Sequence, residues 1–249
     1  MNKMNWNLQG KKALITGGTR GIGRATVDMM CDLGAEVLAV ARTRPDDFPE
    51  REGIHFLAGE VGRAADRTEW LDWVQNRWGK LDILVNNAGT NIRKAAHAFT
   101  EEEIHTVLNT NLLSAFELTR ASLPLLTAAG NASVVMVSSV AGSVDVGTGA
   151  PYGMSKAAMI QLSRNLGGEW AKHGIRVNTV SPWYIDTPLA APVLAQPEKL
   201  ERILMRTPIQ RVGRPEEVAA AISFLCMDLA GYITGQNLAV DGGMLAWGL

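Results

Sequence analysis

Tyr152 and Lys156 are the two residues of this sequence whose types and spacing best suit proton transfer. Residues four apart lie on one face of a helix, and the pattern of 152–172 predicts a helix. A free tyrosine, with a pKa of about 10, is a poor base at neutral pH. An ammonium about 5 Å away, at an effective dielectric of about 20, favours the phenolate by roughly 3 kcal/mol, or about 2 pKa units. Desolvation opposes this shift, and the alternative is a tyrosine packed on a helix beside a lysine stem.

A glycine-rich stretch, TGGTRGIG at 16–23, directly follows the apolar run ALI at 13–15. In α/β sheets, ligands bind at the carboxyl ends of the strands. Gly17, Gly21 and Gly23 at such a place permit a tight turn and let backbone N–H groups approach a pyrophosphate at the start of a helix. The spacing is wider than the G-x-G-x-x-G fingerprint, so a strand-to-helix turn without a ligand is the alternative.

Two arginines bear on which nicotinamide cofactor the glycine-rich stretch would bind. A protein that prefers NAD usually has Asp or Glu about 20 residues past the glycines, bonded to the ribose 2′-hydroxyl. Here the next β-type run ends in Ala41, and Arg42, Thr43 and Arg44 follow. Arg20 and Arg42 can flank a 2′-phosphate, with Thr43 helping, because guanidinium groups match phosphate geometry and keep their charge. The sequence predicts NADPH over NADH, and solvated surface arginines are the alternative.

The elements that must position these residues alternate between short β-type runs and longer helical patterns. Several of the runs are continuously apolar, as expected for strands that are buried on both faces. This alternation predicts an α/β fold, a single-domain Rossmann-type doubly wound parallel sheet with helices on both faces. About seven strands are expected, at 12–16, 36–41, 54–58, 81–86, 133–139, 175–181 and 237–240.

The helical patterns include a start signal and leave one segment unassigned. Thr100, with Glu103 three residues later, has the form of a capping box. Residues 183–212 are rich in Pro, Leu and Ala and fit no strand, so we expect a substrate flap there. The length is within the range of one domain spanning 1–249. Helices are expected at about 64–78, after Thr100, at about 152–172 and after Pro215.

The composition is that of an ordinary globular protein, with 47% hydrophobic and 20% charged residues among 249. The net charge of −1 suggests no general attraction to nucleic acid or anionic membrane. No apolar run approaches the roughly 20 residues that span a bilayer, and the stretch 1–12 lacks the apolar core of a secretory signal. Cys31 and Cys226 are far apart and the histidines lack metal-ligand spacing. We therefore expect a cytoplasmic protein without disulfides or metal.

A series of short motifs in fixed order carries a resemblance to a known family. The chain resembles the short-chain dehydrogenase/reductase family over essentially its whole length, and WAKHGIRVN (170–178) and YITGQ (232–236) make it similar to the tropinone-reductase-like branch. The motifs are TGGTRGIG (16–23), NNAG (86–89), Asn111 in NTNLLSAF, SS (138–139), Tyr152 with Lys156, SPWYIDTP (181–188) and VDGG (240–243).

The resemblance implies a catalytic set of four residues. Tyr152 would donate a proton to a ketone oxygen, or act as the base for an alcohol. Ser139, 13 residues earlier, would bond the same oxygen, with the neighbouring Ser138 as the alternative. Lys156 would bond the nicotinamide ribose and lower the tyrosine pKa. Asn111 would hold a water that relays protons to Lys156.

The resemblance also implies a cofactor channel, in which NNAG lines the adenosine side and Thr187 meets the nicotinamide carboxamide. Two positions depart from common usage in the family. Glu60 stands where many members have Asp, and Trp183 follows Pro182 where glycine is usual. The cofactor-binding set is Gly17, Thr19, Arg20, Gly21, Ile22, Gly23, Arg42, Thr43, Glu60, Val61, Asn87, Ala88, Gly89, Tyr152, Lys156, Pro182, Trp183, Ile185 and Thr187.

The substrate site is expected to be mainly apolar, as suits a compact ketone. Arg93 is the charged member: facing inward it would favour an anionic or acceptor-rich substrate, and facing outward it would be a solvated arginine. Asp145 could instead meet a cationic amine. Trp183 and Tyr184 either form a substrate wall or pack beneath the flap. The candidate substrate residues are Ile92, Arg93, Val144, Trp183, Tyr184 and Leu189.

Taken together, these features predict an NADPH-dependent reductase of small ketones, acting reversibly on the secondary alcohol. An NAD(P)-dependent alcohol dehydrogenase, a 3-oxoacyl reductase and a non-catalytic cofactor-binding sensor are the alternatives. Family resemblance implies a homotetramer or homodimer, with the apolar tail 244–249 against a neighbour and Trp247 near the adjacent site.

Overall fold

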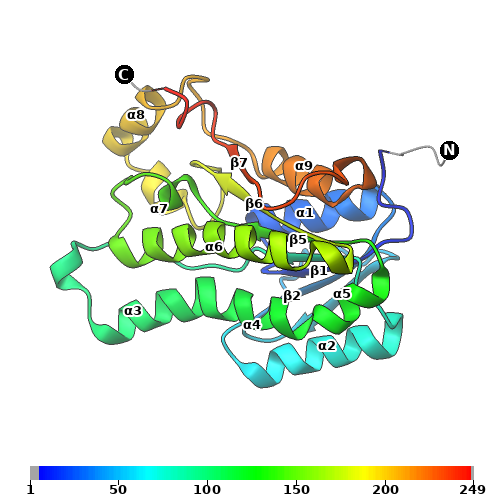
Figure 1. Cartoon of the computed structure of the whole chain (residues 1–249). Helices are drawn as coiled ribbons and strands as arrows, with labels where there is room; N and C mark the ends of the chain where they lie inside the picture. Colours follow the sequence, from blue (N-terminus) through cyan, green and yellow to red (C-terminus); the bar gives the residue numbers. More distant parts are fainter. Residues whose placement is uncertain (1–5, 248–249) are drawn as a thin grey trace.

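A seven-stranded parallel sheet in the order β3-β2-β1-β4-β5-β6-β7 forms the centre of the computed structural model, which describes residues 6–247 (Figure 1). The strand order reverses between β1 and β4, so the loops after these two strands diverge to opposite faces and leave a crevice at their carboxyl ends. The strands are β1 (Lys12–Thr16), β2 (Glu36–Ala41), β3 (Ile54–Ala58), β4 (Ile83–Asn86), β5 (Ala132–Val137), β6 (Ile175–Pro182) and β7 (Asn237–Val240).

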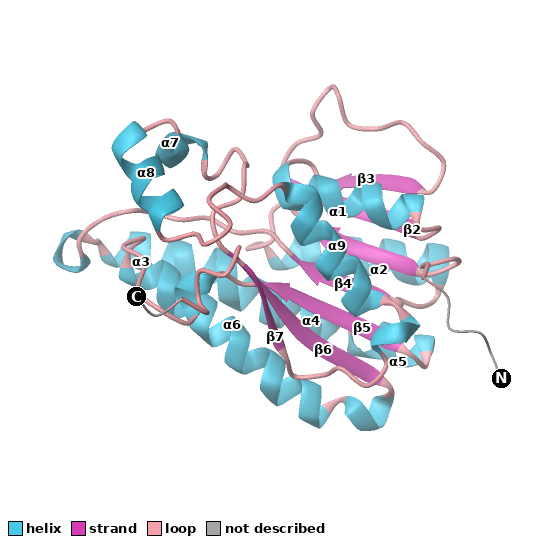
Figure 2. Cartoon of the chain, turned by 90° about the horizontal axis from the view of Figure 1, so that it is seen from above, coloured by secondary structure: helices cyan, strands magenta, loops and turns pink. Residues whose placement is uncertain are grey.

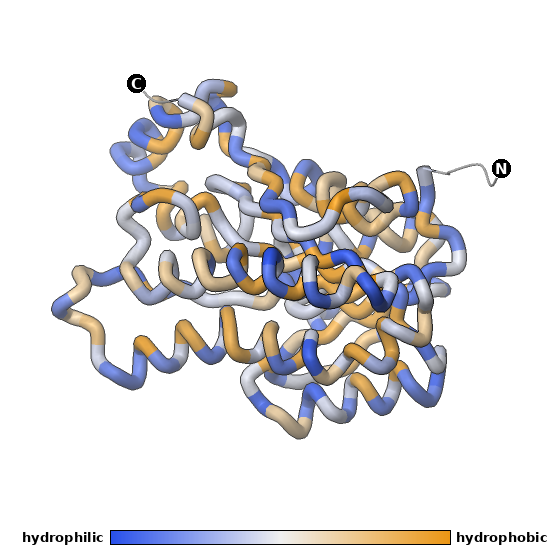
Figure 3. Tube along the Cα trace, viewed as in Figure 1, coloured by the Kyte–Doolittle hydropathy of each residue, from blue (hydrophilic) through white to orange (hydrophobic). Residues whose placement is uncertain are grey.

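Helices cover both faces of this sheet, because alternate residues of each buried strand point to opposite sides. Ala13 and Ile15 of β1 belong to the core beneath α1 and α9, whereas Leu14 belongs to the core beneath α2, α4, α5 and α6. Apolar residues run along the central strands (Figure 3). The helices are α1 (Gly21–Asp32), α2 (Ala64–Trp78), α3 (Glu101–Leu108), α4 (Ser114–Ala121), α5 (Leu123–Ala129), α6 (Ala150–Glu169), α7 (Ala191–Leu194), α8 (Pro197–Met205) and α9 (Pro215–Cys226).

The predicted fold class is confirmed, and most predicted boundaries agree to within two residues. The strand expected at 133–139 ends at Val137, which places the two serines that follow it in the turn beyond the sheet. The helix expected at 152–172 begins at Ala150 and ends at Glu169, and a short 3-10 turn, η4 (Ala171–His173), replaces its last part. Gly174 then ends this turn in a left-handed conformation, with φ of 71°.

The capping box at the start of α3 is confirmed. The hydroxyl of Thr100 accepts the backbone N–H of Glu103 (3.2 Å), and the Glu103 carboxylate accepts that of Thr100 (3.0 Å). The helix then passes directly into a π-helical turn, η2 (Asn109–Leu113), and on into α4. Nothing in the periodicity of the sequence predicts this turn.

The segment 183–212 contains the short helices α7 and α8 and, within the described residues, no named strand. A single bridge joins Ile185 to Gly213 across its base. α7 and α8 stand apart from the helices that cover the sheet (Figures 1 and 2). Along residues 6–247, no helix is both long and apolar enough to span a bilayer.

A cluster around Glu36 ties the first three strands to α2 at the end of the sheet opposite the glycine-rich loop. Its carboxylate accepts hydrogen bonds from His55 of β3 (2.8 Å) and the Trp78 indole of α2 (2.9 Å), and it pairs with Lys12 of β1. Desolvation acts to raise the pKa of Glu36, but the hydrogen bonds from Lys12, Trp78 and His55 outweigh it and lower the pKa from 4.5 to about 2.

Because this carboxylate has a lower pKa in the folded state, its contribution to stability is present above pH 4.5 and is lost as the pH falls towards 2. We expect Glu36→Gln to lower the free energy of unfolding at pH 7 by about 1–2 kcal/mol, the size of a charge-assisted hydrogen bond. The difference from the parent protein should shrink between pH 4.5 and the acid limit of folding. Urea unfolding across this range measures it. Glu117→Gln, at an exposed ion pair with Arg120, is the control and should change stability by less than about 0.5 kcal/mol.

Candidate active site

Lys156 and Tyr152 lie on the first two turns of α6, with the Lys156 Nζ atom 5.6 Å from the centre of the tyrosine ring. The lysine side chain is buried, and its ammonium donates a hydrogen bond to the carbonyl oxygen of Val137, the last residue of β5 (2.8 Å). Pro151 in the first turn of α6 suits a position where no backbone N–H is needed. The predicted juxtaposition of the two side chains is therefore present, at the carboxyl end of a central strand.

The pKa values of this pair follow from burial. Desolvation lowers the pKa of Lys156 to about 8. Desolvation likewise raises the pKa of Tyr152, although a hydrogen bond with Ser139 and the positive charge of Arg93 act in the opposite direction. The expected net decrease in the Tyr152 pKa is wrong for this structure, because burial disfavours the phenolate and its effect is the largest. A contribution of Lys156 to this pKa stays a prediction.

The structure distinguishes the two serines that follow β5. The Ser138 hydroxyl is buried and donates to the backbone carbonyl of Lys156 (2.8 Å), so it fastens α6 to the sheet. Ser139 caps the short turn η3 (Val140–Gly142), where its hydroxyl accepts the N–H of Ala141 (3.2 Å), and it also reaches Tyr152. Of the two hydroxyls, that of Ser138 is used to hold α6, and the role of Ser139 at a carbonyl stays a prediction.

Asn111 lies within the π-helical turn η2 and is fully buried. Its amide exchanges two hydrogen bonds with the backbone of Thr90, at 2.8 and 3.0 Å, and donates to the Ser155 hydroxyl (3.1 Å). Ser155 in turn donates to the carbonyl of Tyr152 (2.7 Å). A Cβ on Gly89 would lie 3.4 Å from Asn111 Oδ1 and 3.6 Å from Lys156 Nζ. The π-turn thus connects the loop after β4 to α6, and such turns are frequent at functional sites.

The glycine-rich loop has the close backbone packing that its sequence predicts. Gly17 and Gly21 have positive φ angles of 66° and 54°. A Cβ on Gly23 would lie 2.1 Å from the Gly17 carbonyl oxygen and 2.5 Å from the Asn87 side-chain nitrogen. Asn87 itself donates to the carbonyl oxygens of Thr16 (2.9 Å) and Gly17 (3.2 Å). Its side chain therefore braces the loop, a role that the sequence did not reveal.

Thr16 is a second contributor that sequence reasoning missed. It is the last residue of β1, and its buried hydroxyl accepts the backbone N–H groups of Asn87 and Ala88, both at 3.0 Å. The hydroxyl thereby holds the ends of β1 and β4 together at the crevice. The available signal was a polar residue at the end of an otherwise apolar run.

The opening of the segment 183–212 lies over the glycine-rich loop. A Cβ on Gly21 would lie 3.1 Å from the Thr187 methyl group. Ile185 is buried in the core beneath α1 and α9, where it anchors this segment. Thr187 and Ile185 thus lie beside the loop, whereas Thr19 and Ile22 are partly buried within it.

The residues proposed for the 2′-phosphate lie at neighbouring strand ends. The backbone N–H of Gly17 donates to Val40 of β2 (2.8 Å), so the glycine-rich loop and the residues after β2 are adjacent. Arg20, Arg42 and Thr43 are exposed. Within residues 6–247, neither Arg20 nor Arg42 forms an ion pair, whereas Arg44 pairs with Glu50 (3.1 Å).

Glu60 and Val61 follow β3 and differ in environment, because one side chain is exposed and the other packs against the core. The Glu60 side chain is exposed, and its backbone N–H donates to Asp66 Oδ2 (2.7 Å). Val61 packs against the core beneath α2. The structure places Glu60 at the same end of the sheet as the glycine-rich loop but shows no side-chain contact between the two.

Trp183 stands where the family usually has glycine, but its backbone is not left-handed. Among the described non-glycine residues, a positive φ occurs at Gln210 and not at Trp183. Its N–H instead bonds Val240 (3.2 Å), as a continuation of β6. The indole donates to the Thr207 hydroxyl (3.0 Å) and packs edge-on against Tyr184, with ring centres 4.7 Å apart.

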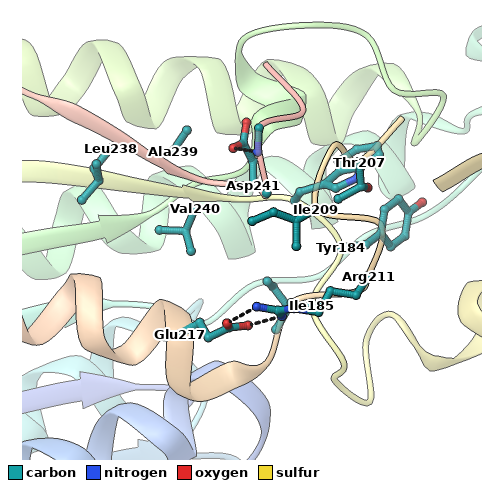
Figure 4. Close-up of a pocket in the computed structure, with 14 residues that line it drawn as sticks. Tyr184, Ile185, Thr207, Ile209, Arg211, Glu217, Leu238, Ala239, Val240 and Asp241 are labelled. Atoms are coloured by element: carbon teal, nitrogen blue, oxygen red, sulfur yellow. Dashed lines mark hydrogen bonds and ion pairs between the residues drawn. The ribbon is translucent and has the colours of Figure 1, made fainter. Parts of the chain in front are cut away.

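A cavity of about 360 Å³ lies behind this aromatic pair. Figure 4 shows Tyr184 and Thr207 at one side of it and the Arg211–Glu217 ion pair at the other. Neither Tyr152 nor Ser139 lines it.

The other candidate substrate residues are distributed around Tyr152. The charge of Arg93 lowers the pKa of Tyr152, against the larger effect of burial, and Tyr184 raises it. Ile92 is half-buried, while Val144 and Leu189 are largely exposed, at 42% and 47%. Their contact with a substrate stays a prediction. In the described part of the chain, no group of three or more His, Cys, Asp or Glu residues could hold a metal ion.

The family model described as "Enoyl-(Acyl carrier protein) reductase" matches residues 17–245. This chain is a short-chain dehydrogenase/reductase. The reductase is 44% identical over 248 residues to "Tropinone reductase homolog At5g06060" of Arabidopsis thaliana, covering 96% of this chain and 93% of that one. It therefore belongs with the tropinone-reductase-like branch.

Solved structures agree in fold with this short-chain dehydrogenase/reductase. A gluconate 5-dehydrogenase from Burkholderia cenocepacia J2315, in complex with NADP and tartrate, is 29% identical with a TM-score of 0.90 and 97% coverage of both chains. The ligand-free aldohexose dehydrogenase of Thermoplasma acidophilum is also 29% identical, with a TM-score of 0.88 and 96% coverage of both chains.

Thr16→Val should destabilise the crevice, because it leaves the partly buried N–H groups of Asn87 and Ala88 without their acceptor. We expect the free energy of unfolding to fall by about 2–4 kcal/mol, from about 1–2 kcal/mol for each unsatisfied group. Urea unfolding measures this, and Thr16→Ser, which keeps the hydroxyl, is the matched control. Equal stability of the two variants would contradict the bracing role of this hydroxyl.

Proposed function

We propose that this chain is an NADPH-dependent carbonyl reductase that converts a small ketone reversibly to a secondary alcohol. The observation that carries the proposal is geometric: the Lys156 Nζ atom lies 5.6 Å from the centre of the Tyr152 ring on α6, and it bonds the carbonyl oxygen of Val137 at the end of β5. In this arrangement the phenol can give its proton to a carbonyl oxygen in the reduction, and its phenolate can accept one from an alcohol in the reverse reaction.

The glycine-rich loop fits a dinucleotide. A side chain at position 23 would collide with the backbone of Gly17, so this position needs glycine. Gly17 and Gly21 have positive φ angles, which form the tight turn before α1. Backbone N–H groups at the start of a helix suit a pyrophosphate. We propose that Thr187, which lies beside Gly21, meets the nicotinamide end and that Lys156 bonds its ribose.

Two unpaired arginines support NADPH over NADH. Arg20 and Arg42 are exposed at adjacent strand ends, and neither is neutralised by a carboxylate within residues 6–247. Two guanidinium groups and the hydroxyl of Thr43 suit a 2′-phosphate, while Ala41, at the end of β2, offers no carboxylate for a ribose hydroxyl.

In the proposed reaction, residues of this chain bind the ketone, polarise its carbonyl group and protonate the carbonyl oxygen. Ser139 donates a hydrogen bond to the carbonyl oxygen, and Tyr152 transfers its proton to the same oxygen as the alcohol forms. NADPH, when bound, supplies the hydride. Lys156, with a pKa of about 8, can exchange a proton near neutral pH, and Asn111 keeps the loop after β4 in register with α6. We propose that Asn111 also orients a water towards Lys156.

The assembly and compartment of the chain are also proposals. We propose a homotetramer or homodimer built on β7, α9 and the C-terminal tail, in which Met244 is buried and Trp247 is 45% exposed; residues 248–249 of that tail lie outside the described part. The thiols of Cys31 and Cys226 are free and buried, which suits a reducing compartment such as the cytoplasm.

Tyr152→Phe should abolish most turnover, because it removes the proton donor and leaves the helix intact. We expect kcat to fall by about 10²–10⁴-fold, with NADPH binding unchanged. NADPH absorbance with a panel of ketones measures turnover, and protein fluorescence measures binding. Tyr232→Phe, at a fully exposed phenol, is the control. Residual turnover above a tenth of the parent rate would reject the role.

Arg42→Asp should reverse the cofactor preference, because it replaces a phosphate-binding cation with a repelling carboxylate. We expect kcat/KM for NADPH to fall by about 10- to 100-fold, with that for NADH unchanged or raised. Arg164→Asp, on an exposed turn of α6, matches the charge change at a distance. An equal loss with both cofactors would show that Arg42 does not bind the 2′-phosphate.

A further inference from the structure

The loop after β4 carries Arg93 and is held against the start of the helix that bears Tyr152. The backbone of Thr90 is fixed to the side-chain amide of Asn111: the Thr90 N–H donates to Asn111 Oδ1 (2.8 Å), and Asn111 Nδ2 donates to the Thr90 carbonyl (3.0 Å). Two residues later, the carbonyl oxygen of Ile92 lies 2.9 Å from where a Cβ on Gly149 would stand. Gly149 is the N-cap of α6, three residues before Tyr152. The loop is therefore held against the start of the catalytic helix immediately before Arg93.

The charge of Arg93 is available for a ligand. Its side chain is exposed, and across residues 6–247 it has neither an ion pair nor a side-chain hydrogen bond. The next residue, Lys94, is neutralised by an ion pair with Glu103. Arg93 lies close enough to Tyr152 for its charge to lower the phenol pKa, against the larger upward effect of burial.

One acidic residue, Asp145, lies in the loop that leads to Gly149. Its carboxylate oxygen accepts the backbone N–H of Gly147 (2.9 Å). Asp145 is therefore bonded within its own loop, and within residues 6–247 it forms no ion pair with Arg93.

We propose that Arg93 binds the carboxylate of an anionic substrate, so that this chain reduces an oxo acid to a hydroxy acid. This rests on the proposed reductase function. The carbonyl carbon gains a hydride from NADPH, its oxygen gains the proton of Tyr152, and the carboxylate is unchanged. A planar guanidinium matches a carboxylate with two parallel hydrogen bonds. The same charge disfavours a cationic amine, since like charges at a binding site reduce affinity.

The test compares oxo acids with their methyl esters, which are similar in shape and differ in charge. The probes are the 2-, 4- and 5-oxo acids of five and six carbons, assayed with NADPH. We expect at least one acid to exceed its ester in kcat/KM by about tenfold or more. Arg93→Met should lower that acid-to-ester ratio by about 10- to 100-fold, and Arg93→Lys should restore part of it.

Lys94→Met is the matched control, because it removes a neighbouring cation that is already paired with Glu103; the ratio should stay unchanged. The NADPH dissociation constant and the melting temperature of each variant check folding. Inhibition of the parent protein by hydroxy acids and by their amides gives a test that needs no variant, and the acids should bind at least tenfold more tightly.

The outcomes separate the two proposals. If no acid, ester or neutral ketone such as cyclohexanone is reduced, the reductase function itself fails. If esters and neutral ketones are reduced but acids have no advantage, or if Arg93→Met leaves the ratio unchanged, the reductase function stands and the assignment of Arg93 is overturned.

Discussion

The hydrogen bond from the Lys156 ammonium to the carbonyl oxygen of Val137 joins the two elements on which the rest of the site depends. Burying a charged group without a carboxylate is costly, and the lysine responds with a pKa of about 8. Since an apolar residue would pack here at lower cost, the lysine makes sense as part of a site and not of the core. Its bond sets how far α6 stands from β5, and hence where Tyr152 lies.

A second constraint acts across the crevice. Thr16 and Asn87 bind the ends of β1 and β4 together, and Asn111 binds the loop after β4 to α6 through Thr90 and Ser155. The polar side chains at these strand ends therefore bond mainly to backbone. Buried polar groups satisfied in this way fix one arrangement, because each would be left unpaired in any other. The glycine-rich loop and α6 are parts of one connected network of hydrogen bonds.

The strands and helices of the sheet could be predicted from the sequence. Short, mainly apolar runs such as 36–41 and 54–58, alternating with helical patterns, indicate the strands of a parallel sheet. The π-turn at Asn109–Leu113 could not, because its hydrogen bonding leaves no mark on hydrophobic periodicity. Thr16 and Asn87 bond to backbone brought close only by the fold. The direction of the Tyr152 pKa was wrong because desolvation depends on packing by distant segments, whereas a charge four residues away is visible in the sequence.

The π-turn has a consequence for anyone who redesigns this scaffold. A π-helical turn holds one residue more than the regular helix would, and it is commonly less favourable than α-helix. Deleting a residue between 109 and 113 would let α3 and α4 merge into one continuous, more regular helix with α4 still in register. The amide of Asn111 would then rotate away from Thr90 and Ser155. Making this helix regular would favour its stability but would remove the contacts of Asn111 that hold the loop after β4 to α6. The π-turn should therefore be kept in a redesign.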